Sequence, residues 1–110
     1  MNKKIVYQQQ MILDQSGFPI QCLGNIFDGD QLSGKSAIDI FPFIESIYPN
    51  LLQLSAEAFP VIYPIVHGNH PLLPGYYEFR FERLSPSTIQ WIIIDVSQMY
   101  EALLRQKQSE

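Results

Sequence analysis

The chain has 110 residues, the length of one typical domain, and 46% of them are hydrophobic and 13% aromatic, which suffices for a core without disulfides. The formal net charge is −4 and, apart from Lys3-Lys4, the Lys and Arg residues are scattered, so the sequence argues against nucleic-acid binding. A single cysteine, Cys22, excludes an internal disulfide and a multi-cysteine zinc site.

The sequence also argues against membrane insertion. No segment holds about 18 uninterrupted apolar residues, the minimum for a spanning helix. The N-terminal segment MNKKIVYQQQ has two lysines but then turns polar, so it lacks the apolar run of a secretory signal. We therefore expect a cytoplasmic single-domain protein or fragment.

The first predicted elements are two strands joined by a tight turn. Residues 5–14 predict a strand that is strongest at Met11-Ile12-Leu13. Asp, Ser and Gly over residues 14–17 are typical of a hairpin turn. Residues 19–23 predict the second strand, and Pro19, which lacks a backbone N–H, suits the start of a strand or an edge.

The middle of the chain predicts two short helices. Residues 24–34 are rich in Asp and Gly and predict a loop with at most one helical turn. Apolar residues then recur at spacings of three and four, which is typical of a helix. Pro42 and Pro49 interrupt this pattern because proline lacks an N–H and clashes with the preceding turn. We therefore predict helices near residues 36–41 and 43–55.

Three further strands are predicted after these helices. Residues 61–66 form the first, and Pro64 inside it indicates an edge strand. Residues 67–75 predict a long loop. Residues 76–84 alternate between apolar and charged, as in a half-buried antiparallel strand. Residues 88–94 are apolar on both faces, which predicts a central strand covered on both sides.

The chain closes with a predicted amphipathic helix. Asp95 is a natural N-cap, and Gln98 completes the spacing of a capping box. The apolar stripe consists of Val96, Met99, Tyr100, Leu103 and Leu104. This order of elements predicts an α+β fold, with one five-stranded antiparallel sheet, short helices on one face and a C-terminal linker helix.

Three segments of the sequence resemble a PAS sensor domain. Ile12-Leu13-Asp14-x-x-Gly17-x-x-Ile20 resembles the opening hairpin of that family. Leu32-Ser33-Gly34-Lys35-Ser36-x-x-Asp39-Ile40-Phe41-Pro42 resembles its Gly-Lys-Ser stretch, which leads into the helices beside the ligand pocket. Trp91-Ile92-Ile93-Ile94-Asp95-Val96-Ser97 resembles its last strand, which ends in an Asp-hydrophobic-Ser signature before the output helix.

The resemblance implies a strand order of 2-1-5-4-3. It also implies a PAS-like sensor domain over residues 1–95 and the start of a signalling helix over residues 96–110. The two strand prolines, Pro19 and Pro64, agree with this order because strands two and three are its edges. The sequence departs from the family after Asn25, where the usual helix is shortened or missing.

The resemblance further implies a sensory or regulatory module of a bacterial signal-transduction protein, such as a two-component system. Such a module is not an enzyme, and any histidine kinase or cyclase activity would lie in an output domain outside this chain. The signal would pass through Asp95, Val96 and Ser97 to the C-terminal helix. The spacing of Met99 and Leu103 suits a coiled coil with a second copy, so we expect a homodimer.

Members of the PAS family hold small ligands between their helices and their sheet. Aromatic residues in the corresponding segments are therefore candidates for lining a pocket: Phe41, Phe43, Tyr63, Tyr77, Phe79 and Trp91. Haem is disfavoured because no histidine lies on a helix before the third strand, and photoactive flavin because Cys22 lies outside the corresponding cysteine motif. A ligand-free dimerisation module of the same fold is the alternative, favoured by the shortened segment after Asn25.

A small enzyme is a third hypothesis. His67 and His70 are three residues apart, and with a third group such as Glu78 they could act on a substrate or hold a metal. Neither spacing is characteristic of a metal site, so we predict no catalytic residue and no metal ligand.

Overall fold

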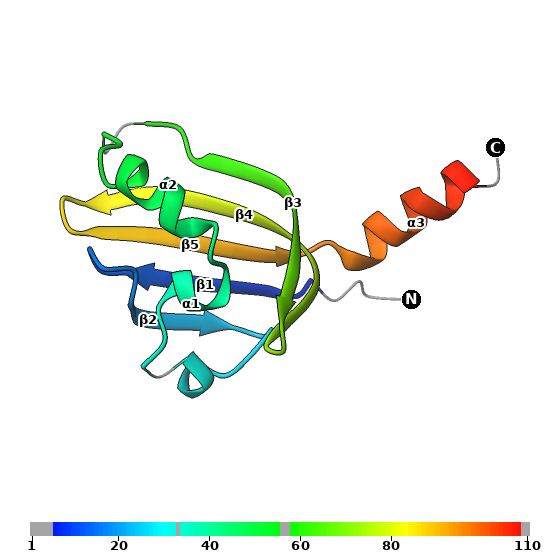
Figure 1. The fold of residues 1–110 in the computed structure, drawn as a ribbon, viewed down its shortest axis with the longest axis horizontal. Coiled ribbons are helices and arrows are strands. Elements are labelled where there is room, and N and C mark those ends of the chain that lie inside the picture. The colour runs from blue at the N-terminus through cyan, green and yellow to red at the C-terminus, as the bar shows by residue number, and fades with distance from the viewer. Residues whose placement is uncertain (1–5, 33, 56–57, 109–110) are drawn as a thin grey trace.

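The structure of the chain is a computed structural model that describes residues 6–32, 34–55 and 58–108. Lys3, Lys4 and Ser33 of the segments discussed above lie outside the described residues. One antiparallel sheet has the order β2-β1-β5-β4-β3 (Figure 1). Its strands are β1 (Gln8–Leu13), β2 (Pro19–Gly24), β3 (Val61–His70), β4 (Leu73–Ser85) and β5 (Thr88–Asp95). The expected α+β fold and strand order are confirmed.

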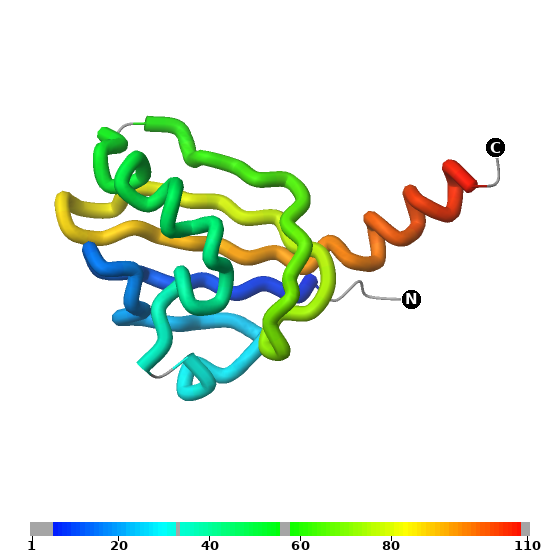
Figure 2. The backbone as a smooth tube through the Cα atoms, in the orientation of Figure 1, coloured from blue at the N-terminus to red at the C-terminus, as the bar shows by residue number. Residues whose placement is uncertain are grey.

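Short helices cover one face of this sheet, and a longer helix leaves it. The 3₁₀ helix η1 (Gly29–Leu32) is the one helical turn expected in the Asp- and Gly-rich loop. Helices α1 (Ala37–Ile40) and α2 (Ile44–Leu51) lie over the sheet, whereas α3 (Ser97–Gln108) projects away from it (Figures 1 and 2). No helix in the described part of the chain is long and apolar enough to cross a membrane.

Local chemistry explains why α1 and α2 are separate and shorter than predicted. The Ser36 hydroxyl accepts from the Asp39 amide at 3.3 Å, and the Asp39 carboxylate accepts from the Ser36 amide at 2.8 Å, which forms a capping box at the start of α1. Phe41 adopts an extended conformation before Pro42 and ends α1. Pro49 lies inside α2, which ends two residues later at Leu51 rather than near residue 55.

The core is aromatic and lies between the helices and the sheet. Trp91 of β5 and Phe79 of β4 are fully buried, and their ring centroids lie 5.1 Å apart. The Tyr48 hydroxyl of α2 donates to the backbone carbonyl of Asp14 at 2.5 Å and joins this layer to the β1–β2 turn. The other fully buried large residues are Phe81, Met11, Leu13, Leu32, Ile44, Leu73, Ile89, Ile93 and Gln9.

The β3–β4 connection differs from the prediction. Residues 67–75 are not a long loop, because β3 continues to His70 and β4 begins at Leu73. Gly68 pairs with Gly75 inside this hairpin. A Cβ at Gly68 would lie 1.9 Å from the Leu73 carbonyl oxygen. The two glycines thus allow the backbones of β3 and β4 to approach closely, whereas their sequence predicted a loop.

The two faces of β5 are unequal, and this also corrects the prediction. The strand is buried on the helix side, but Ile92 and Ile94 remain only half-buried on the other side. On that second face the Gln10 side chain donates to the Gln90 side chain at 2.8 Å. Because α3 projects away, it does not cover this face (Figure 1).

The edge positions of Pro19 and Pro64 are confirmed. Pro19 begins β2, and Pro64 lies in β3 at the point where its register with β4 shifts between Tyr63 and Val66. Both strands are sheet edges, where a missing backbone donor costs least because only one side of the strand is paired.

Truncating the core at Phe79 tests this packing. We expect Phe79→Ala to lower the free energy of unfolding by about 3–5 kcal/mol, because it leaves a cavity among the other rings. Phe59→Ala is the matched control, since Phe59 is 92% exposed and should change stability by less than about 0.5 kcal/mol. Urea unfolding followed by tryptophan fluorescence measures both. Similar losses in the two variants would contradict the described core.

Candidate functional site

The junction between β5 and α3 lies where the sequence places the signalling signature. Asp95 ends β5, Ser97 begins α3, and only Val96 lies between them. The Val96 carbonyl accepts from the Tyr100 amide at 2.9 Å, so Val96 occupies the N-cap position. The predicted N-cap at Asp95 is therefore wrong by one residue. The Asp95 carboxylate still accepts from the Ser97 amide at 2.9 Å, but it does so from the end of the strand.

Hydrogen bonds link this junction to two neighbouring segments, β4 and the residue before β1. The Asp95 amide donates to the carbonyl of Tyr7 at 2.9 Å, and the Val96 amide donates to the carbonyl of Tyr76 at 2.9 Å. The Ser97 hydroxyl accepts from the Tyr76 amide at 2.9 Å and donates to the Tyr76 carbonyl at 3.3 Å. The junction is thus bonded to β4 and to the segment before β1, so the start of α3 cannot move without disturbing the sheet.

Gly75 makes room for this arrangement. Its φ of +123° is a conformation that L side chains rarely adopt, and a Cβ there would lie 2.6 Å from the Ser97 hydroxyl oxygen. Sequence reasoning assigned Gly75 to a loop and singled out neither it nor Tyr76. Their role depends on contact with a segment distant in the sequence, and the only local signal was the glycine itself.

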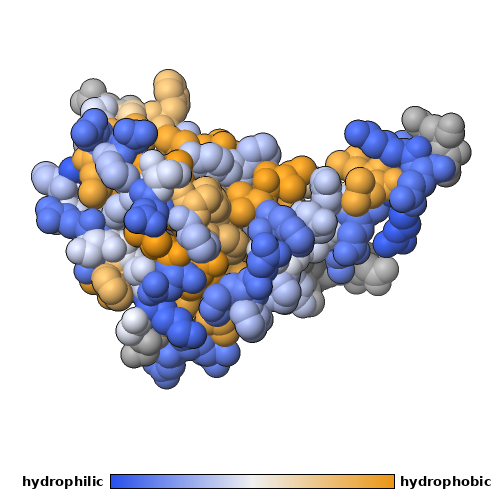
Figure 3. Space-filling view, viewed as in Figure 1, coloured by the Kyte–Doolittle hydropathy of each residue, from blue (hydrophilic) through white to orange (hydrophobic). Residues whose placement is uncertain are grey.

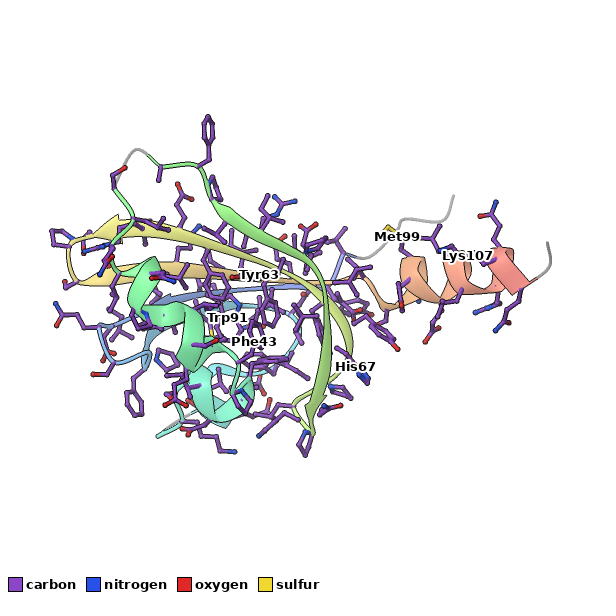
Figure 4. The ribbon with its side chains drawn as sticks, turned by 45° about the horizontal axis from the view of Figure 1, so that its top comes forward. Phe43, Tyr63, His67, Trp91, Met99 and Lys107 are labelled. Atoms are coloured by element: carbon purple, nitrogen blue, oxygen red, sulfur yellow. The ribbon has the colours of Figure 1, made fainter. Side chains whose placement is uncertain are left out.

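The two predicted dimer residues lie on the surface of α3. No residue of the described part of α3 is buried. Met99 (Figure 4) is 56% exposed and Leu103 is 48% exposed, and hydrophobic residues gather on one side of the helix (Figure 3). Met99 also borders a groove of about 740 Å³ beside the junction, together with Val6, Tyr7 and Ile94. An apolar surface therefore runs from the junction onto α3.

The structure brings together five of the six pocket candidates, and they pack on one another. The Phe79 ring lies 4.7 Å from Phe41 and 6.1 Å from Phe43, and Phe43 lies 5.9 Å from Tyr63. Trp91 joins this cluster through Phe41, with ring centroids 5.9 Å apart. Tyr77 differs from them, because its hydroxyl donates to the Pro74 carbonyl at 2.7 Å near the β3–β4 turn.

Trp91 carries an unpaired polar atom in this core. The side chain is fully buried, and its Nε1 has no hydrogen-bond partner among the residues that the structure describes. A buried donor without an acceptor costs about 1–3 kcal/mol. The indole N–H is therefore the one described side-chain donor in the aromatic core that an added acceptor would satisfy.

The candidate residues of an enzyme or metal site have other contacts. The His67 ring stacks on Tyr76 with centroids 4.8 Å apart. His70 Nδ1 accepts from the Leu72 amide at 3.1 Å, and Glu78 pairs with Arg80 at 2.7 Å. Among the described residues, no three His, Cys, Asp or Glu side chains form a group that could hold a metal ion. Cys22 Sγ accepts from Gln9 Nε2 at 2.9 Å.

The sequence was compared with models of protein families and with curated proteins. No family model matches the chain, and no curated protein matches it. The resemblance to PAS domains therefore stays a prediction that rests on the chain's own residues.

Replacing Gly75 tests the packing of the junction. We expect Gly75→Ala to destabilise the protein by at least about 1 kcal/mol more than Gly34→Ala does. An alanine would be strained by the positive φ at either position, but nothing lies within 4 Å of a Cβ at Gly34. Urea unfolding of Gly75→Ala, Ser97→Ala and the double variant checks the cause. The double variant should lose less stability than the two losses added together, and strict additivity would refute the clash with Ser97.

Two buried tyrosines predict a loss of stability at alkaline pH. Burial, aided by the nearby Asp14, raises the pKa of Tyr48 to about 12, and burial, aided by Asp95, raises the pKa of Tyr77 to about 12. An unfolded tyrosine has a pKa of about 10, so the stability is fully present below pH 10 and is lost as pH rises toward 12. Urea unfolding across this range should show a shallower pH dependence in Tyr48→Phe/Tyr77→Phe. An unchanged pH dependence of the stability would show that Tyr48 and Tyr77 are not its cause.

Proposed function

We propose that this chain is a PAS-type regulatory module of a cytoplasmic signal-transduction protein. It passes packing changes in the sheet through Asp95, Val96 and Ser97 into α3. The observation that carries this proposal is the junction itself. Asp95 at the end of β5 is hydrogen-bonded to Tyr7, and Val96 and Ser97 are hydrogen-bonded to Tyr76. None of the described residues of α3 is buried. A helix held rigidly at one end and exposed along its length is suited to transmit movement.

The three segments that resemble the family support the proposal because each forms a connection within the fold. In the first segment the Asp14 carboxylate accepts from the Ser16 amide at 2.9 Å and from the Phe18 amide at 3.0 Å, which closes the β1–β2 turn. The second segment supplies the capping box of α1 described above. The third forms the junction. The strand order expected from the resemblance is also present.

The proposed partner is a second copy of the chain. Met99 and Leu103 are exposed on α3 with coiled-coil spacing, and burying them against the same residues of another copy would remove this apolar surface from water. An output domain, such as a histidine kinase or a cyclase, would follow α3 in the protein that uses this module. The module itself contributes no catalytic group.

The ligand-free form of this module is the better supported one, because ring contacts fill the space in which a ligand would lie. One observation favours the second candidate, a module that senses a small ligand. The buried Trp91 N–H lacks an acceptor among the described residues, and a ligand with a small acceptor group would supply it.

Native mass spectrometry, compared with the denatured sample, separates these proposals. We expect a dimer of bare chains, which Met99→Asp/Leu103→Asp converts to a monomer because the carboxylates of the two copies would face one another in an apolar interface. Glu101→Gln is the matched control on α3 and should remain dimeric. A monomeric parent, or a dimer that survives the double substitution, would refute pairing through α3. Extra mass that denaturation removes would establish the ligand-binding form instead.

A further inference from the structure

Three rings from three different elements stack beside the junction. His67 of β3 faces Tyr76 of β4 across the strand pair, with ring centroids 4.8 Å apart and planes 19° from parallel. Tyr76 in turn contacts Tyr100 of α3, with centroids 4.4 Å apart and planes at 48°. Figure 4 shows His67 on the side of β3 that faces α3. The ring stack, which is His67, Tyr76 and Tyr100, thus joins an edge strand to the signalling helix.

The ring stack gives α3 a second point of attachment. The first is Ser97, whose hydroxyl is hydrogen-bonded to the backbone of Tyr76. A helix held at one residue can still swing about that residue. Tyr100 follows Ser97 by three positions, so both lie on the same face of α3, and both contact Tyr76. Two contacts along one face define the direction of the helix axis.

The described residues of α3 pack only loosely on the sheet. None of its described residues is buried, and the element that it contacts most is β4. Tyr100 is half-buried, whereas Met99 and Leu103 of the same apolar stripe are exposed. Removing the Tyr100 ring would therefore take away a contact with β4 that Ser97 does not replace.

We infer that the ring stack sets the direction in which α3 leaves the domain and makes β3 a second input to that helix. His67 and Tyr100 are positioning residues in this arrangement. His67 supports the Tyr76 ring from the β3 side, so a displacement of β3 reaches α3 without passing through the core or through β5. The inference rests on the proposed relay for its biological meaning, but the direction of the helix is measurable without any output domain.

Distances between spin labels test the inference. Labels at Gln21→Cys on β2 and Lys107→Cys near the end of α3, in a Cys22→Ser background, report the direction of the helix. The labelled chain is diluted into unlabelled chain, so that only distances within one molecule are measured. We expect a narrow distribution that broadens at least about twofold in Tyr100→Ala and in His67→Ala, and that stays narrow in Tyr100→Phe, which keeps the ring.

Phe59→Ala is the control for removal of an aromatic ring elsewhere, since Phe59 is 92% exposed and lies outside the stack. Thermal melts confirm that each variant is folded, and His67 is an exposed residue whose loss leaves the core intact. A distribution that is broad in the parent, or equally narrow in His67→Ala and Tyr100→Ala, overturns the inference. Equal broadening in Phe59→Ala also overturns it. All distances are measured in a Met99→Asp/Leu103→Asp background, in which α3 does not pair with a second copy, so the proposed partner can fail while the stack is upheld.

Discussion

The backbone of Tyr76 holds the start of α3 with both of its polar groups, and the proposed function depends on this interaction. The pairing of β4 with β5 reaches its last partners at Tyr77 and Asp95. The hydrogen bond from Val96 to Tyr76 extends that pairing by one residue, and Ser97 then occupies the remaining amide of Tyr76. The helix is therefore a continuation of the central strand, and Gly75 is the residue that leaves space for it.

The composition of the core suits a mechanical relay. Successive side chains of a strand point to opposite faces of the sheet, so Trp91 and Ile93 lie on the same face of β5 as Asp95. Trp91 contacts Phe79 and Phe41, which connects the helix layer to this strand. Densely packed interiors transmit displacement because they have few alternative arrangements. In the proposed relay, a change in the aromatic core would pass along β5 toward the junction, and the inferred ring stack would add a separate route from β3.

Local patterns in the sequence predicted the elements whose causes are local. Alternation predicted β4, and the prolines at positions 19 and 64 predicted which strands are edges. The prediction of a loop over residues 67–75 was wrong because glycines are typical of turns. Gly68 and Gly75 instead lie in β3 and β4, where they pair with each other. The ring stack and the unpaired Trp91 N–H were beyond prediction, since they depend on which distant residues meet. The same holds for the predicted PAS function. Its motifs are short segments that the sequence displays, whereas the contacts that would carry a signal join segments distant in the sequence.

The most direct test of the account is whether a change in the core reaches α3 through the junction. Phe79→Leu alters packing without removing the core residue, and two-dimensional NMR of amide groups follows the result. The account predicts shifted resonances at Ser97 and Tyr100, and the loss of those shifts when Asp95→Ala is already present. Resonances of α3 that do not respond to Phe79→Leu, or that respond equally with Asp95→Ala in place, would contradict a relay through this junction.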